Sequence, residues 1–124
     1  MTEGQSDGTA ETVELKIPAS ASYLRLARLA AADVAARAGW TYEEIDDLRI
    51  AVDELCYAIG AGSDSGWLTL TYAARDGHIE VQGTGTDTGA AIDPGELSEA
   101  IVSAVVDEFD LDRAAATFRL VKRG

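Results

Sequence analysis

Hydrophobic and polar residues alternate near the start of the chain and then change to a helical period. Residues 13–17 place an apolar side chain at every second position, which is typical of a half-buried strand, and Pro18 follows. Apolar residues in the next segment, 20–38, recur three and four apart, with a serine near its beginning and Gly39 at its end. The pattern predicts a strand followed by a helix.

The segment that comes next has a stronger helix signal. Thr41 and Glu44 have the spacing of a capping box, in which each side chain accepts a hydrogen bond from the other residue's backbone N–H. Apolar residues then recur in alternating steps of three and four from Ile45 to Ile59. We expect an amphipathic helix over residues 41–59 with its apolar stripe buried.

The second half of the chain begins as a hairpin. Apolar and polar residues alternate on both sides of Asp76-Gly77, a pair that is favoured in two-residue turns. An aspartate, a proline and a glutamate within residues 93–96 then mark a helix start, and this helix is expected to continue to residue 106. After an acidic segment, a last strand is expected over residues 116–122.

The predicted order is strand, helix, helix, strand, strand, helix, strand. Because strands and helices do not alternate regularly, we expect an α+β fold, a two-layer sandwich with helices packed on one face of a mostly antiparallel sheet. The length of 124 residues fits a single domain. We assign this domain to residues 13–124, and the acidic, polar residues 1–12 to a disordered tail.

Composition narrows the classes of function. The net charge of −12 disfavours direct binding to nucleic acid, which requires a basic face against the phosphates. The same charge would attract a basic protein partner. No segment approaches the roughly 20 apolar residues of a membrane span. The single cysteine, Cys56, excludes an internal disulfide, so we expect a soluble cytoplasmic protein.

Glu54 is the main candidate for chemistry. It follows Asp53 at the edge of the buried stripe, so its carboxylate could enter a cleft between helix and sheet and act as a base. The alternative is that Glu54 only borders the core as one more charge on an acidic chain. Neither Cys56 nor His78 has companions that would complete a zinc site, so we expect no metal site. The loop GTGTDTG, residues 83–89, lacks the lysine of a phosphate-binding loop.

The segment TYEEIDDLRIAVDELCYAI, residues 41–59, resembles the N-box region of the anti-sigma regulatory factor family. These proteins are small serine kinases of the GHKL ATPase superfamily, which also contains the catalytic domains of histidine kinases. Arg28 before an alanine-rich stretch is similar to the family, and VVDEFDLDRAAATFRLVKR, residues 105–123, is similar to its last helix end and closing strands. The resemblance covers residues 13–122 and implies a shortened GHKL-type sandwich.

The resemblance also assigns roles to positions, several of which lack the family's residue. Glu54 falls on the position of the catalytic glutamate, whereas Ala58 replaces the asparagine that would hold Mg²⁺ and offers no oxygen ligand. Gly83 replaces the aspartate that reads the adenine amino group. Gly85 keeps the first glycine of that motif, and Asp87 replaces the second.

These departures imply that Mg²⁺-ATP is not a cofactor of this chain and that kinase activity has been lost. The segment between residues 89 and 97 is also too short for the family's ATP lid. The alternative is a divergent serine/threonine kinase that phosphorylates an anti-anti-sigma protein. In such an enzyme Asp53, Asp87 or a backbone carbonyl would replace the missing metal ligand.

For binding, the resemblance implies partner switching. Family members hold a sigma factor inactive and release it when an anti-anti-sigma protein of the STAS type competes. The family's first-helix arginine, which contacts both partners, falls on Arg28, and Arg25 lies on the same side of the helix. The alternative is that both arginines are ordinary solvated charges.

The resemblance further implies a homodimer, because family members often dimerise through the first strand and helix. A third interpretation of the chain is a catalytically dead dimerising scaffold without a sigma partner.

Overall fold

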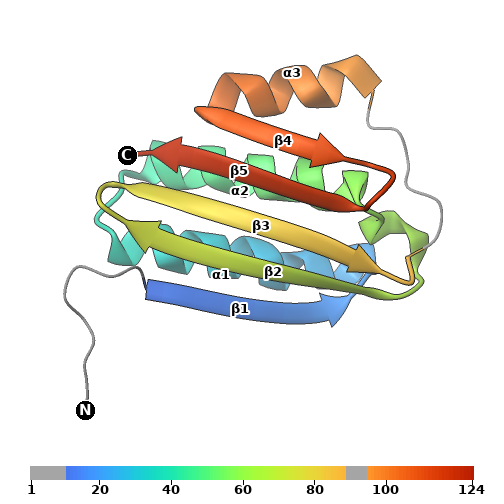
Figure 1. Ribbon diagram of the computed structural model, residues 1–124. Helices are drawn as coiled ribbons and strands as arrows, with labels where there is room; N and C mark the ends of the chain where they lie inside the picture. The colour runs from blue at the N-terminus through green and yellow to red at the C-terminus, as the bar shows by residue number, and fades with distance from the viewer. Residues whose placement is uncertain (1–10, 89–94) are drawn as a thin grey trace, which may run out of the picture.

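The chain folds into two layers, a five-stranded antiparallel sheet with α1 and α2 packed on one face (Figure 1). The computed structural model describes residues 11–88 and 95–124. The strands β1 (Glu11–Pro18), β2 (Trp67–Arg75), β3 (His78–Thr86), β4 (Glu108–Asp112) and β5 (Thr117–Arg123) lie in the order β1-β2-β3-β5-β4. The helices are α1 (Leu24–Arg37), α2 (Tyr42–Ala58) and α3 (Gly95–Val105), with short 3₁₀ turns at Ala21–Tyr23 and Ala61–Ser63. The predicted α+β sandwich is confirmed.

Local hydrogen bonds determine where the first two helices begin. The Ser20 hydroxyl accepts a hydrogen bond from the backbone N–H of Ser22, in the 3₁₀ turn that leads into α1. At α2, the Thr41 hydroxyl accepts from the Glu44 N–H at 3.2 Å, and the Glu44 carboxylate accepts from the Thr41 N–H at 2.8 Å. Both halves of the predicted capping box therefore form.

β2 and β3 form the predicted hairpin. Asp76 and Gly77 have φ angles of 48° and 82°, as both central residues of a type I′ turn require. The register places Leu70 opposite Gly83. The apolar side chains of both strands consequently face the same layer, the one occupied by the helices.

β4 corrects the sequence analysis, which counted four strands from the alternation pattern. Alternation alone does not predict a strand here, because three of its five residues are aspartate or glutamate. The resemblance, in contrast, implies closing strands in this region. In the structure those three are exposed, and the two apolar residues between them pack against the core. β4 is an edge strand, where charged side chains are tolerated because they discourage pairing with other chains.

The core lies between the sheet and helices α1 and α2. Leu48, Val52 and Leu55 of α2 are buried, as the helical spacing predicted. The Tyr72 hydroxyl of β2 donates a hydrogen bond to the Ala27 carbonyl of α1 at 2.9 Å, and burial raises the pKa of this tyrosine. Sheet and helices are thus joined by a polar contact inside an otherwise apolar layer.

Two sequence predictions fall on parts of the chain that the structure does not describe. The helix start signal at Asp93 and Pro94 lies outside the described residues, as does most of the predicted tail. Among the described helices, none is long and apolar enough to cross a membrane.

Candidate functional site

Glu54 lies on α2 in a stripe with Asp47, Ala51 and Ala58. The two alanines are fully buried and Glu54 is half-buried, so the stripe follows the margin of the core. At the start of the stripe, Asp47 lies 3.9 Å from the Nζ of Lys122, which also donates to the last turn of α3. Within residues 11–88 and 95–124, the Glu54 carboxylate forms neither a hydrogen bond nor an ion pair.

The C-terminal end of α2 is closed by direct contact with β3. Ala58 is fully buried and presents only a methyl group. A Cβ added at Gly85 would lie 2.5 Å from the carbonyl oxygen of Ile59, and one added at Gly60 would lie 2.6 Å from the Cβ of Thr88. Both distances are shorter than van der Waals contact. Glycine at these two positions therefore allows β3 and Thr88, which follows it, to pack directly on the end of the helix.

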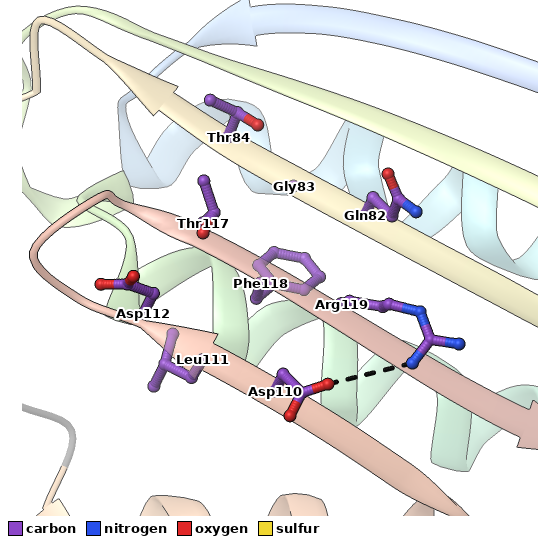
Figure 2. Close-up of a pocket in the computed structure, with 9 residues that line it drawn as sticks. All are labelled: Gln82, Gly83, Thr84, Asp110, Leu111, Asp112, Thr117, Phe118 and Arg119. Atoms are coloured by element: carbon purple, nitrogen blue, oxygen red, sulfur yellow. Dashed lines mark ion pairs between the residues drawn. The ribbon is translucent and has the colours of Figure 1, made fainter.

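Phe118 fills the space beside Gly83. The two residues are opposite each other on β5 and β3, as Figure 2 also shows. A Cβ added at Gly83 would overlap the Cε2 atom of the Phe118 ring, and this ring is buried. A side chain at position 83 would have to displace the ring. Position 83, which the resemblance aligns with the family's adenine-reading aspartate, is thus covered by an aromatic ring from the neighbouring strand.

Asp87 lies just after β3 and is held through its backbone. Its φ angle is 56°, and its carbonyl accepts a hydrogen bond from the Ser65 hydroxyl at 2.9 Å. A Cβ added at Gly66 would overlap the same carbonyl oxygen, so the loop after α2 packs tightly against it. The structure therefore brings Gly85 and Asp87 to the end of α2.

A groove between α1 and α2, which we call the arginine groove, lies elsewhere on the molecule. Its volume is about 540 Å³, and it is lined by Arg25, Arg28, Leu29, Ala32 and Arg49. The structure thus places both sequence-predicted arginines at one groove and adds three residues that sequence analysis did not select. Arg49 could have been found, because it precedes Asp53 by one helical turn on the same side of α2.

Ion pairs hold two of the three arginines. Arg28 pairs with Asp53 at 2.7 Å, with side chains 36% and 27% exposed, and Arg49 lies 3.6 Å from Asp46. Arg25 forms no ion pair with any described residue. Two separate regions therefore adjoin α2: a closed one at its C-terminal end, and the open groove beside α1.

The histidine kinase-like ATPase domain family matches residues 17–113 of this chain. The chain belongs to that family. A curated relative is the serine-protein kinase RsbW of Bacillus cereus (strain B4264), 33% identical over 94 residues, which cover 73% of this chain and 58% of the relative. The RsbW of Bacillus thuringiensis (strain Al Hakam) is 32% identical with the same coverage. The match thus spans less than two thirds of these relatives.

A solved structure agrees with this family assignment at the level of the fold. The crystal structure of the RsbU and RsbW domains of a Mycobacterium tuberculosis protein has a TM-score of 0.68, covering 91% of this chain and 32% of that chain. The sequences are 19% identical, so the likeness concerns the fold alone. The resemblance to the anti-sigma regulatory factor family is confirmed as a family relationship.

In this histidine kinase-like domain, the lone cysteine lies on α2 and the lone histidine on β3. Cys56 is fully buried in the core, and burial raises the pKa of its thiol, which keeps it protonated. His78 begins β3 beside the hairpin turn. No group of three or more His, Cys, Asp or Glu residues in the described chain could hold a metal ion.

A hollow of about 400 Å³ lies along β3, β5 and β4 (Figure 2). Its lining includes Gly83 and Phe118, but no residue of α2. Its one cation, Arg119, is paired with Glu80 at 2.7 Å and Glu108 at 3.1 Å, and this pairing raises the arginine's pKa. Carboxylates of the neighbouring strands thus neutralise the guanidinium charge.

Proposed function

We propose that this domain is an anti-sigma-type regulator that works in the cytoplasm by protein–protein binding, without phosphoryl transfer. Its proposed partners are a sigma factor, a STAS-type anti-anti-sigma protein, or both in competition, as in the family that it resembles. It would act as a pseudokinase, a kinase-like domain that still binds its protein partners but no longer catalyses phosphoryl transfer.

The observation that carries this proposal is the contact between Phe118 and Gly83. Phosphoryl transfer depends on positioning the nucleotide and neutralising its charge. Because the Phe118 ring occupies the space that a Cβ at position 83 would need, no room is left for a polar reader of adenine. Ala58 supplies no oxygen for Mg²⁺. These residues do not fit Mg²⁺-ATP, and Glu54 without nucleotide and metal has nothing to act on.

The arginine groove supports the binding half of the proposal. Three guanidinium groups lie at one groove on a chain whose net charge is −12. Leu29 at the same groove is 55% exposed, so it offers apolar contact beside the charges. Arginine is enriched at protein–protein interfaces, and Leu29 adds apolar surface beside it. We propose that Arg25 and Arg28 contact carboxylates of the partner at this groove.

Calorimetry with Mg²⁺-ATP and Mg²⁺-ADP tests whether nucleotide binding has been lost, with Glu54→Ala as a matched variant. We expect no binding heat at millimolar nucleotide from either protein. Metal-dependent binding by the wild type would overturn the proposal.

In parallel, purified candidate sigma and STAS proteins are tested for binding to the wild type and to Arg28→Ala. Binding that the substitution weakens is expected, and no binding to either class would remove the regulatory function.

A serine/threonine kinase is the second candidate. The relatives carry the name serine-protein kinase, and Glu54 is retained without a partner among the described residues. Incubation with labelled ATP and a STAS-type protein separates the candidates. Label transfer that disappears on Glu54→Ala would establish the kinase, whereas no transfer by the wild type leaves the binding module.

We also propose that the domain forms a homodimer through its first strand and first helix. β1 is an edge of the sheet, and its residues are mostly exposed. Light scattering across a concentration series tests this, and a monomer at every concentration would contradict it.

A further inference from the structure

The arginine groove gathers positive charge on a chain that is otherwise strongly acidic. Its three guanidinium groups come from two helices, Arg25 and Arg28 from α1 and Arg49 from α2. They are three of only 10 basic residues in a chain with 22 acidic ones. Clusters of arginine from more than one element are typical of sites that bind anionic groups of a partner.

Hydrogen bonds within the described chain engage only one of these three guanidinium groups. Arg28 donates from its Nη1 atom to Asp53 at 2.7 Å. Arg49 lies 3.6 Å from Asp46, which is too far for a hydrogen bond, and the Arg25 side chain has no hydrogen bond or ion pair with any described residue. Arg25 and Arg49 therefore keep their planar forks of N–H donors available for a ligand.

Asp53 orients Arg28 without using all of its donors. The contact involves the Nη1 atom alone, so the Nε and Nη2 atoms form no hydrogen bond with a described residue. The Arg28 side chain remains partly exposed. A side chain that is already held in one geometry loses less conformational freedom when a ligand binds, which favours affinity. Asp53 thus acts as a positioning residue for the groove.

The number of available cations favours a phosphoryl group over a single carboxylate. A phosphorylated serine or threonine carries about −1.5 to −2 charges at pH 7 and three acceptor oxygens. This charge matches the two guanidiniums that have no hydrogen-bonded partner in the described chain, Arg25 and Arg49. A carboxylate brings one charge and two oxygens, which a single arginine satisfies in a bidentate pair. One cation of the groove would then remain without an anion.

The apolar part of the lining favours a phosphoryl group that belongs to a polypeptide. Leu29, which is 55% exposed, and Ala32 line the groove beside the arginines. The volume of about 540 Å³ falls in the range of pockets that hold ligands much larger than a single ion. A phosphorylated residue of a partner could place its phosphoryl group among the arginines and a neighbouring apolar side chain on Leu29.

We propose that the arginine groove recognises a phosphorylated serine or threonine of a protein partner, through Arg25, Arg49 and an Arg28 that Asp53 positions. This inference rests on the proposed function, because it specifies which group of a partner the groove binds. The phosphoryl group binds there more tightly than a carboxylate does. The groove binds this group without transferring it, so a separate kinase must supply it.

Peptide titration tests the ligand. The probe is a synthetic pentapeptide with phosphoserine between two alanines and leucine at both ends. The controls are the same peptide with serine or aspartate at the central position, and inorganic phosphate. NMR follows the Nε–H signals of the groove arginines in the full chain. We expect saturable shifts with the phosphoserine peptide, about tenfold weaker binding of the aspartate peptide and of phosphate, and no shift with the serine peptide.

Substitutions assign the binding to the groove. Arg25→Ala and Arg49→Ala should each weaken binding of the phosphoserine peptide about tenfold, because each removes charge-assisted hydrogen bonds. Arg25→Lys should weaken it less, since lysine keeps the charge but loses the planar fork. Arg37→Ala removes the same charge from α1 at an exposed pair with Asp33, outside the groove, and should change the affinity less than about twofold. Circular dichroism checks that each variant is folded.

Several results would overturn this recognition. They are no binding of the phosphoserine peptide at millimolar concentration, equal binding of the aspartate peptide or of inorganic phosphate, and an equal loss in Arg37→Ala and Arg25→Ala. Tighter binding to vesicles that contain a phosphoinositide than to the peptide would also overturn it.

The proposed function is tested separately on the same samples. If a sigma or STAS partner binds the wild type more tightly than Arg28→Ala, the proposed function stands even when the phosphoserine peptide fails to bind. Binding of the phosphoserine peptide by a wild type that binds neither partner class would support the phosphoryl site and remove the proposed function.

Discussion

The two regions beside α2 differ in how they are filled. At the C-terminal end, glycines let β3 touch the helix, and Phe118 covers Gly83, so the region is packed like an interior. Beside α1, Arg49 of the same helix lines a groove of about 540 Å³, and Asp53 pairs with Arg28, another residue of its lining. The same helix thus has a closed, apolar contact with β3 at its C-terminal end and an open, charged groove on its side toward α1. The open groove lies between α1 and α2, whereas Glu54, the position that the resemblance assigns to catalysis, lies on α2.

The largest expected effect comes from emptying the closed region. Phe118→Ala removes a buried ring beside Gly83 and should lower the free energy of unfolding by about 3–5 kcal/mol, through lost burial and the cavity left behind. Urea denaturation measures it. Leu29→Ala in the open groove, where the side chain is 55% exposed, should change stability by less than about 0.5 kcal/mol. Equal losses in the two variants would abolish the contrast.

Adding a side chain at position 83, against the Phe118 ring, should lower the free energy of unfolding by less. Gly83→Ala adds a Cβ against the Phe118 ring and is expected to destabilise the domain by about 1–3 kcal/mol. In a Phe118→Ala background the added methyl has room, so the double-mutant cycle should show a coupling of about 1 kcal/mol or more. Additive effects would mean that Phe118 does not occupy the space at position 83.

In the open groove the expected effect is on binding. Arg28→Ala should weaken a sigma or STAS partner about 10- to 100-fold, as loss of an arginine anchor often does. The free energy of unfolding should change by less than about 1 kcal/mol, because the pair with Asp53 is partly exposed. Arg37→Ala is the control, since Arg37 also pairs with an aspartate at 2.7 Å, Asp33 on α1, although both of these side chains are more exposed. Equal losses of binding in both variants would assign the effect to net charge.

The smallest effect concerns the helix that both regions share. The Glu44 carboxylate accepts a hydrogen bond from the Thr41 N–H, which lowers the pKa of Glu44. Since the folded pKa is below the unfolded one, this stabilisation is present above the unfolded value and is lost as pH falls through the folded value. Glu44→Gln keeps an acceptor that does not titrate. Melting temperatures of the two proteins should therefore depend differently on pH in the acidic range. If the two plots of melting temperature against pH ran parallel, the stability of the capping box would not depend on ionisation of Glu44.

Sequence patterns predicted the elements whose signals are local. The capping box of α2 and the Asp76-Gly77 turn each depend on residues at most three positions apart, and both form as expected. The pattern did not predict β4 as a strand, because its three charged residues obscured a short alternation of apolar and polar positions. An edge strand tolerates charges that a central strand would not, and edge position is a property of the whole sheet.

The candidate site was predictable only as a set of positions. Resemblance selected Gly83 as a missing aspartate, but it could not show that Phe118 covers that position, because the two residues meet only through pairing of β3 with β5. Likewise Arg49 joins Arg25 and Arg28 only once α1 packs beside α2. Contacts between segments distant in sequence follow from tertiary packing, which local periodicity does not encode.

The place of β1 in the sheet has a consequence for the order of folding. Its ladder with β2 spans both α1 and α2 along the chain, whereas β2 and β3 are joined by a two-residue turn. Closing a long loop costs more entropy than closing a short one, and nonlocal pairing slows folding. The β2–β3 hairpin should therefore form early and β1 late. In a nascent chain, β1 emerges before β2 and β3, so that strand would stay unpaired until the hairpin has left the ribosome.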